Sequence, residues 1–243
     1  WVRSDRVGVG FESKKAKKKI ASLYKPLFLI ETPMLFTDLK TAELIKYSAN
    51  AFLALKISYI NQMADLCEKI GADVHDVAKG IGLDKRIGNK FLHPGPGYGG
   101  SCFPKDTIAL VKTANQNNSD ISIIDTVIKY NTNRKSEMAN KILKKLGNDL
   151  TNKKVSILGL SFKPETDDMR DSPSLDIIPI LQKNGITISA YDPVAMNEAK
   201  KLLKNTEFSN DLETCLQNSD ALVILTEWNE FRGLLPDYLS KYM

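Results

Sequence analysis

The sequence predicts an α/β protein in which a central domain built on one long helix is followed by a Rossmann-like domain with a parallel sheet. Residues 39–70 contain neither glycine nor proline, and their apolar side chains recur at helical spacing. From residue 155 onward, short apolar runs alternate with helical stretches, which is typical of a βαβαβ unit. The 243 residues, with 42% apolar content, are enough for one large domain or two modest ones.

The first 37 residues have the pattern of the end of an α/β domain. Strands are predicted at 7–11 and 27–31, on either side of a helix at 14–24. The chain contains no G-x-G-x-x-G sequence, so it does not encode a standard dinucleotide-binding loop. We therefore interpret residues 1–37 as the remnant of an N-terminal domain whose beginning is missing.

Much of the net charge of +5 comes from the lysines of residues 14–19, KKAKKK. Such a run belongs either to a solvated helix face or to a phosphate or nucleic-acid patch. The absence of interleaved aromatic residues and of any nucleic-acid-binding motif favours the solvated face. We expect no nucleic acid as a partner.

The long helix at 39–70 starts after Thr37 or Asp38, either of which can cap it, and Gly71 is a natural stop. Its length exceeds the ~8–20 residues of most globular helices. Its apolar stripe is a candidate dimerisation face, with ordinary core burial as the alternative.

The remaining elements divide the chain into three regions. Helices are expected at 73–81, 108–115 and 121–146, and the polar, turn-rich segment 147–152 follows them. The last region is predicted to hold strands at 155–160, 186–191 and 221–226 and helices at 173–183 and 197–203. The predicted domains are residues 1–37, 38–147 and 148–243.

The three cysteines are too few for a disulfide framework, so a reducing, cytoplasmic location is expected. No apolar run approaches the roughly 20 residues that a membrane span needs. Cys67 and Cys215 stand in apolar helical contexts and are predicted to be core residues.

Cys102 is different because it stands in a loop rich in glycine and proline. Gly99 and Gly100 carry no side chains, which would let a substrate approach the sulfur. Lys105 could favour the nucleophilic thiolate. Asp106, one helical turn on, could activate a water molecule. Structural and catalytic roles for Cys102 are about equally supported by these residue types.

Two other groups of polar residues are candidates for a site. Lys46 and Asn50 share one face of the long helix, where a buried pair could stabilise a developing oxyanion. Phe162 and Lys163 directly follow the first strand of the last region, where parallel sheets bind ligands, and Arg170 lies further along. His75 and His93 have no partners at ligand spacing, so no metal site is predicted.

These motifs together resemble the UDP-glucose 6-dehydrogenases of the UDP-glucose/GDP-mannose dehydrogenase family. The matching segments are GGSCFPKD at 99–106, AELIKYSANAFLALKISYIN at 42–61, GIGLDKRIGNKFL at 80–92, LGLSFKPETDDMRDSPS at 158–174 and LTEWNEF at 225–231. They occur in the same order as in the family and cover the chain from about Val7 to its end. The resemblance implies a homodimer in which the last region is a UDP-binding domain.

The resemblance also implies a four-electron oxidation of UDP-glucose to UDP-glucuronate by NAD, as a step toward polysaccharide synthesis. Cys102 matches the nucleophile, Asp106 the residue that activates water, and Lys46 with Asn50 the pair that steadies negative charge. The matching substrate contacts are Lys46, Phe91, Leu92, His93, Pro94, Gly95, Gly99, Phe103, Phe162 and Lys163. Arg86 matches an arginine that reaches the substrate of a neighbouring subunit. Lys105 and Arg170 match residues that touch NAD.

The chain departs from the family because most of the N-terminal NAD-binding domain and the final strand region are missing from it. We expect the chain alone to be inactive. The alternatives are a sister dehydrogenase acting on GDP-mannose or UDP-N-acetylmannosamine, and a non-catalytic nucleotide-sugar-binding dimer module. Ser101 and the segment 103–105 favour UDP-glucose over the N-acetyl sugar.

Overall fold

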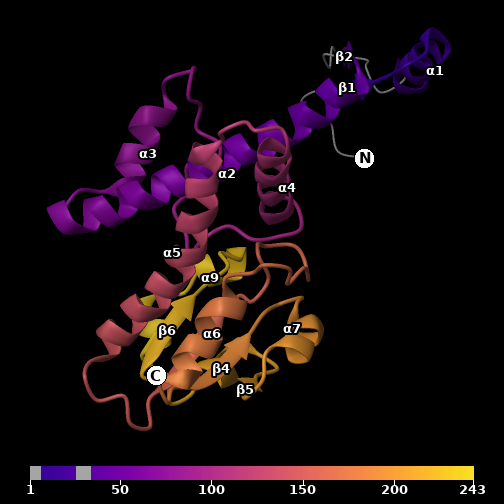
Figure 1. Cartoon of the computed structure of the whole chain (residues 1–243). Helices are drawn as coiled ribbons and strands as arrows, with labels where there is room; N and C mark the ends of the chain where they lie inside the picture. Colours follow the sequence, from indigo (N-terminus) through magenta and orange to yellow (C-terminus); the bar gives the residue numbers. More distant parts are fainter. Residues whose placement is uncertain (1–6, 26–33) are drawn as a thin grey trace.

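A computed structural model describes residues 7–25 and 34–243 and confirms the α/β class (Figure 1). The chain begins with β1 (Val7–Gly10), α1 (Lys14–Tyr24) and β2 (Met34–Thr37), and the two strands pair in parallel. The strand predicted at 27–31 lies outside the described residues, and β2 was not predicted. This N-terminal unit lies beyond the start of α2, away from the C-terminal sheet (Figure 1). The lysines of α1 are mostly exposed, as predicted for a solvated face.

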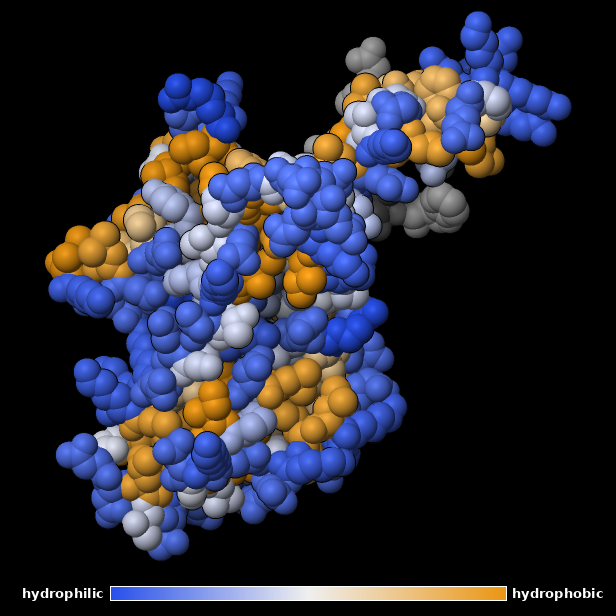
Figure 2. Space-filling view, viewed as in Figure 1, coloured by the Kyte–Doolittle hydropathy of each residue, from blue (hydrophilic) through white to orange (hydrophobic). Residues whose placement is uncertain are grey.

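The long helix α2 (Leu39–Ile70) has the bounds that the sequence predicts. Asp38, one of the two predicted caps, accepts the backbone N–H of Thr41 at 2.9 Å. Gly71 ends the helix with φ +76°, a left-handed conformation that favours glycine. Figure 2 shows apolar side chains at the surface over the end of α2 that is farthest from β1, where Leu66 and Ile70 are exposed.

Three helices pack around α2. They are α3 (Val74–Gly82), α4 (Phe103–Gln116) and α5 (Ser122–Leu146). α4 begins five residues earlier than predicted, directly after Cys102, with Pro104 in its first turn. α5 runs from α2 down to the sheet (Figure 1), and its last turns join the core of the sheet domain through Ala139 and its neighbours.

The C-terminal region is a four-stranded parallel sheet with the order β5-β4-β3-β6. Its elements are β3 (Lys154–Leu158), α6 (Ser174–Lys183), β4 (Thr187–Tyr191), α7 (Met196–Leu202), β5 (Thr206–Phe208), α8 (Leu212–Leu216), β6 (Ala221–Ile224), α9 (Asn229–Arg232) and α10 (Pro236–Leu239). β3, β4 and β6 confirm the three predicted strands. β5 and α8 escaped prediction because three and five residues are too short to show a period. Pro173 stands just before α6 rather than inside its first turn.

The order of the strands defines where a ligand can bind. β3 lies between β4 and β6, because the chain first adds β4 and β5 on one side of β3 and then crosses back to add β6 on the other side. Parallel sheets bind ligands at the carboxyl ends of the strands at such a switch point. The loop that follows β3 carries Phe162, Lys163 and Arg170. No helix among the described residues is both long and apolar enough to cross a membrane.

Candidate functional site

Cys102 is the only one of the three cysteines whose residue is exposed. It directly precedes α4, and its sulfur lies 3.7 Å from the hydroxyl of Ser101. Cys67 and Cys215 are buried, as predicted, and burial raises the pKa of the Cys215 thiol.

Asp106 is the centre of a polar network beside Cys102. Its carboxylate, only 2% exposed as a residue, accepts the side-chain amide of Asn50 at 2.5 Å and the ammonium of Lys105 at 2.6 Å. Burial would raise the pKa of Asp106, but the hydrogen bonds from Lys105 and Asn50 and the charge of Lys46 outweigh it and lower the pKa. The structure therefore holds Asp106 as a carboxylate.

Lys46 extends this network on α2. Its ammonium lies 3.3 Å from the amide oxygen of Asn50, the i to i+4 partner that the sequence predicts. The expectation of a buried pair is half right: Asn50 is buried, whereas Lys46 is exposed. Because the Lys46 ammonium is exposed, it can still donate a hydrogen bond to a substrate that enters from solvent.

The two glycines before Cys102 have a packing role that the sequence did not predict. A Cβ on Gly99 would stand 2.3 Å from the carbonyl oxygen of Asp171, and one on Gly100 would stand 2.6 Å from the ring of Phe162. Gly100 also has φ +84° and donates its N–H to the carbonyl of Arg170 at 2.7 Å. The glycines are thus needed because the cysteine loop lies directly on the loop after β3.

That contact brings the two predicted halves of the site together. Lys163 is exposed, with its ammonium 5.5 Å from the ring centre of Phe162. Arg170 is also exposed and forms two hydrogen bonds to Asp168. The pKa values of Lys105 and Arg170 are raised, mainly by hydrogen bonds to Asp106 and Asp168, with a smaller contribution from the sulfur of Cys102.

The segment 91–95 is only partly available to a ligand through its side chains. Phe91 has φ +64° and packs its ring 6.0 Å from that of Phe103, and His93 is exposed. Leu92 is buried, so any ligand contact from it would involve its backbone. Pro94 and Gly95 are half-buried.

Among the described residues, no contact joins Arg86 to the Cys102 network. Its guanidinium is paired with Asp84 at 2.6 Å and its side chain is 90% exposed. Among the described residues, no group of histidine, cysteine and carboxylate side chains could hold a metal ion.

Residues that were not predicted to belong to the site anchor the segment 91–95. Asn61 accepts the N–H of Gly95 at 2.8 Å, and Arg134 donates to the carbonyl of Gly95 at 2.7 Å. Arg134 is buried and paired with Asp65. The sequence shows only that Arg134 is a charged residue within a helical stretch. It does not reveal that this position on α5 faces α2.

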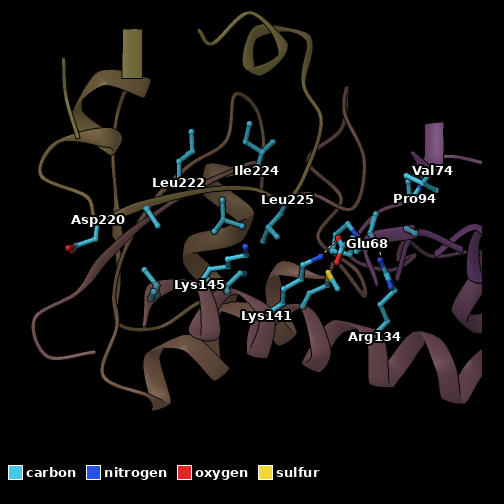
Figure 3. Close-up of a pocket in the computed structure, with 18 of the residues that line it drawn as sticks. Glu68, Val74, Pro94, Arg134, Lys141, Lys145, Asp220, Leu222, Ile224 and Leu225 are labelled. Carbon is cyan, nitrogen blue, oxygen red and sulfur yellow. Dashed lines mark hydrogen bonds and ion pairs between the residues drawn. The ribbon is translucent and has the colours of Figure 1, made fainter. Parts of the chain in front are cut away.

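A cavity of about 600 Å³ lies elsewhere, between α2, α5 and β6 (Figure 3). Two predicted substrate contacts, Pro94 and Gly95, line it, but none of the predicted catalytic residues does. Four of its charged groups form ion pairs with each other, Lys141 with Glu68 and Lys153 with Asp220. We therefore locate the candidate site at Cys102 rather than in this cavity.

Comparisons with known proteins match both halves of this arrangement. Residues 40–133 match the central domain of the UDP-glucose/GDP-mannose dehydrogenase family, and residues 156–243 match the UDP binding domain of the same family. The chain is 50% identical over 243 residues to a UDP-glucose 6-dehydrogenase from Rhizobium meliloti (strain 1021), covering 99% of this chain and 56% of that protein.

Solved structures of nucleotide-sugar dehydrogenases have a similar fold. A UDP-glucose dehydrogenase from Pyrobaculum islandicum has a TM-score of 0.89 at 34% identity, over 95% of this chain and 53% of that one. A UDP-D-ManNAc dehydrogenase from Pyrococcus horikoshii has a TM-score of 0.80 at 26% identity, over 97% and 53% of the two chains. The chain thus spans about half the length of the relatives it matches. With two consecutive domains matched, it belongs to the UDP-glucose/GDP-mannose dehydrogenase family.

Proposed function

We propose that this chain supplies the catalytic cysteine and the nucleotide-sugar site of an NAD-dependent UDP-glucose 6-dehydrogenase, which forms UDP-glucuronate. The observation that carries the proposal is an exposed thiol, Cys102, beside the buried Asn50–Asp106 pair and against the switch-point loop of a parallel sheet. The similarity to UDP-glucose 6-dehydrogenases supports this substrate over those of the sister enzymes. The unpaired cysteines suit a cytoplasmic location.

The chain's own residues can carry the covalent chemistry. The thiolate of Cys102 attacks the aldehyde carbon at C6, and the resulting alkoxide is stabilised by donors from Lys46 and Asn50. Once that centre is oxidised to a thioester, water attacks the carbonyl carbon. The carbon–sulfur bond then breaks, Cys102 leaves as a thiolate, and the carboxylate of Asp106 accepts the proton from water.

NAD, when bound, supplies the oxidation by accepting one hydride from C6 in each of two successive steps. Lys105 and Arg170 fit such an anionic cofactor because both are exposed cations near Cys102, whose sulfur contributes to raising their pKa values. The sequence lacks the glycine-rich loop that binds a pyrophosphate, so these two residues would add to a site built mainly elsewhere.

Removing Lys163 should weaken the binding of UDP-glucose by roughly tenfold or more, because one charge-assisted contact to a phosphate is lost. Calorimetric titration of the chain and of Lys163→Ala with UDP-glucose and GDP-mannose measures this. Lys200→Ala is a matched control, since Lys200 also lies over a phenylalanine ring of the sheet domain, 5.9 Å from Phe208. Its affinity should equal that of the unaltered chain.

Other results would redirect the assignment. Tighter binding of GDP-mannose would favour the sister enzyme. UDP-glucose binding by a whole protein that forms no NADH from UDP-glucose and NAD would favour a non-catalytic module. Binding that does not depend on Lys163 would remove the switch-point loop from the proposal.

The proposal includes a homodimer formed through α2. Phe52, Tyr59 and Leu66 follow one another at seven-residue intervals on this helix and are 60%, 47% and 47% exposed. Beside them, a groove of about 280 Å³ separates α2 from α5. Spacing by seven places side chains on one helical face, and a second copy would cover such an apolar stripe.

Phe52→Glu should convert the dimer to a monomer, halving the mass in sedimentation velocity at micromolar concentration, because the charge would be buried against apolar partners. Leu202→Glu serves as the control because Leu202 is an equally exposed apolar residue on α7, off the stripe. A monomeric unaltered chain, or a dimer that survives Phe52→Glu, would remove α2 from the interface.

A further inference from the structure

Two buried polar residues on α5, four apart and therefore on one face, contact loops of both domains. Asn131 holds Tyr98 at both backbone groups, accepting its N–H at 2.8 Å and donating to its carbonyl at 3.0 Å. Lys135 is 8% exposed, although an ammonium is costly to bury. A cation retained at such a depth calls for a role that an apolar side chain of similar size would not fill.

The contacts of Lys135 join the central domain to the sheet domain. Its ammonium donates to the carbonyl of Asp171 at 3.1 Å and pairs with the carboxylate of Asp176 on α6 at 2.7 Å. Its aliphatic stem packs against Gly97, where a Cβ would lie 3.3 Å from the Cγ of the lysine. One side chain therefore touches the loop that leads to Cys102 and the loop that follows β3.

The carbonyl that Lys135 holds is part of the surface on which the cysteine loop rests. Gly99 packs against the same Asp171 oxygen, and Gly100 donates its N–H to the adjacent carbonyl of Arg170. Cys102 is two residues beyond Gly100. If the 170–171 backbone moved, the glycine loop would lose its support and the sulfur would move relative to Lys163.

We propose that Lys135 is a positioning residue that fixes the cysteine loop against the switch-point loop, so that Cys102 and Lys163 face a single bound nucleotide sugar. The shared nucleotide sugar rests on the proposed function, whereas the docking of the two loops does not. Asn131 supports the same arrangement from the Tyr98 side.

Hydrogen–deuterium exchange on the chain tests the docking directly. Lys135→Met, which keeps the length and removes the charge, should speed exchange in peptides covering 97–102 and 168–172 by about tenfold, the order expected for a lost charged hydrogen bond. Peptides covering β3 should be unchanged. Unchanged loop exchange, or equal acceleration of loops and sheet, would overturn the proposal.

Asp176→Asn separates positioning from ion pairing, because it removes the partner charge and leaves the bond to Asp171. We expect its loops to exchange as in the unaltered chain; acceleration equal to that of Lys135→Met would overturn the proposal. If Lys135→Met does not fold, the milder Lys135→Gln must show the same local selectivity for the proposal to stand. Lys141→Met, on the same helix but off both loops, should change neither segment.

UDP-glucose binding then connects the docking to function. Lys135→Met should weaken binding by about tenfold, while Lys141→Met should not. If the unaltered chain binds no UDP-glucose, the proposed function fails while the exchange result still decides the role of Lys135. Selective loop exchange with unaltered affinity would overturn the link between positioning and substrate binding.

Discussion

In the whole protein, Cys102→Ser should lower the proposed formation of UDP-glucuronate by roughly a thousandfold or more, because a serine hydroxyl is a far weaker nucleophile without a dedicated base. The substitution keeps nearly the same size at an exposed position, so the fold should be retained. The measurement is the rate of UDP-glucose-dependent NADH production. Cys67→Ala, which alters a buried thiol on α2, is the control and should retain activity.

Thiol titration of the chain alone provides a second measurement for the same substitution. The native chain should show one fast-reacting thiol, since Cys67 and Cys215 are buried, and Cys102→Ser should lose it. A Cys102→Ser enzyme with more than about a tenth of the original activity would rule out covalent catalysis at this residue.

Gly159→Ala should lower the free energy of unfolding of the sheet domain by about 4 kcal/mol, combining backbone strain with overpacking. Gly159 follows β3 with φ +82°, and a Cβ there would lie 2.5 Å from that of Thr226 and 2.7 Å from its backbone nitrogen and oxygen. The neighbouring backbone cannot move easily because Thr226 donates to the carbonyl of Ser161 at 2.5 Å. The loop that carries Lys163 depends on this close approach.

Gly185→Ala is the matched control for that prediction. Gly185 has nearly the same backbone angle, φ +84°, but nothing lies within 4 Å of an added Cβ. It should therefore cost only the conformational strain, about 1 kcal/mol. Urea unfolding followed by circular dichroism measures both variants; equal losses would mean that the contact with Thr226 contributes nothing.

Local patterns were sufficient to predict the elements and part of the site. The run of residues 39–70 without glycine or proline, a capping Asp38 and a terminal Gly71 define α2, because helix formation depends on neighbours within one turn. The apolar runs of β3, β4 and β6 alternate with helical stretches, and this alternation predicts a parallel sheet because a crossover helix between two strands leaves them parallel. The pairing of Lys46 with Asn50 followed from their spacing on one helix.

Contacts between distant segments were beyond such patterns. Asn50 and Asp106 are 56 residues apart, and Lys135 and Asp171 are 36 apart, so only the packing of α2, α4, α5 and the sheet brings them into hydrogen-bonding range. The sequence alone determined the long helix, the parallel sheet, the candidate cysteine and the family. The tertiary structure alone decided which polar side chains are buried, why Gly99 carries no side chain, and how Cys102 meets the switch-point loop, because burial and close approach depend on segments that are far apart in the chain.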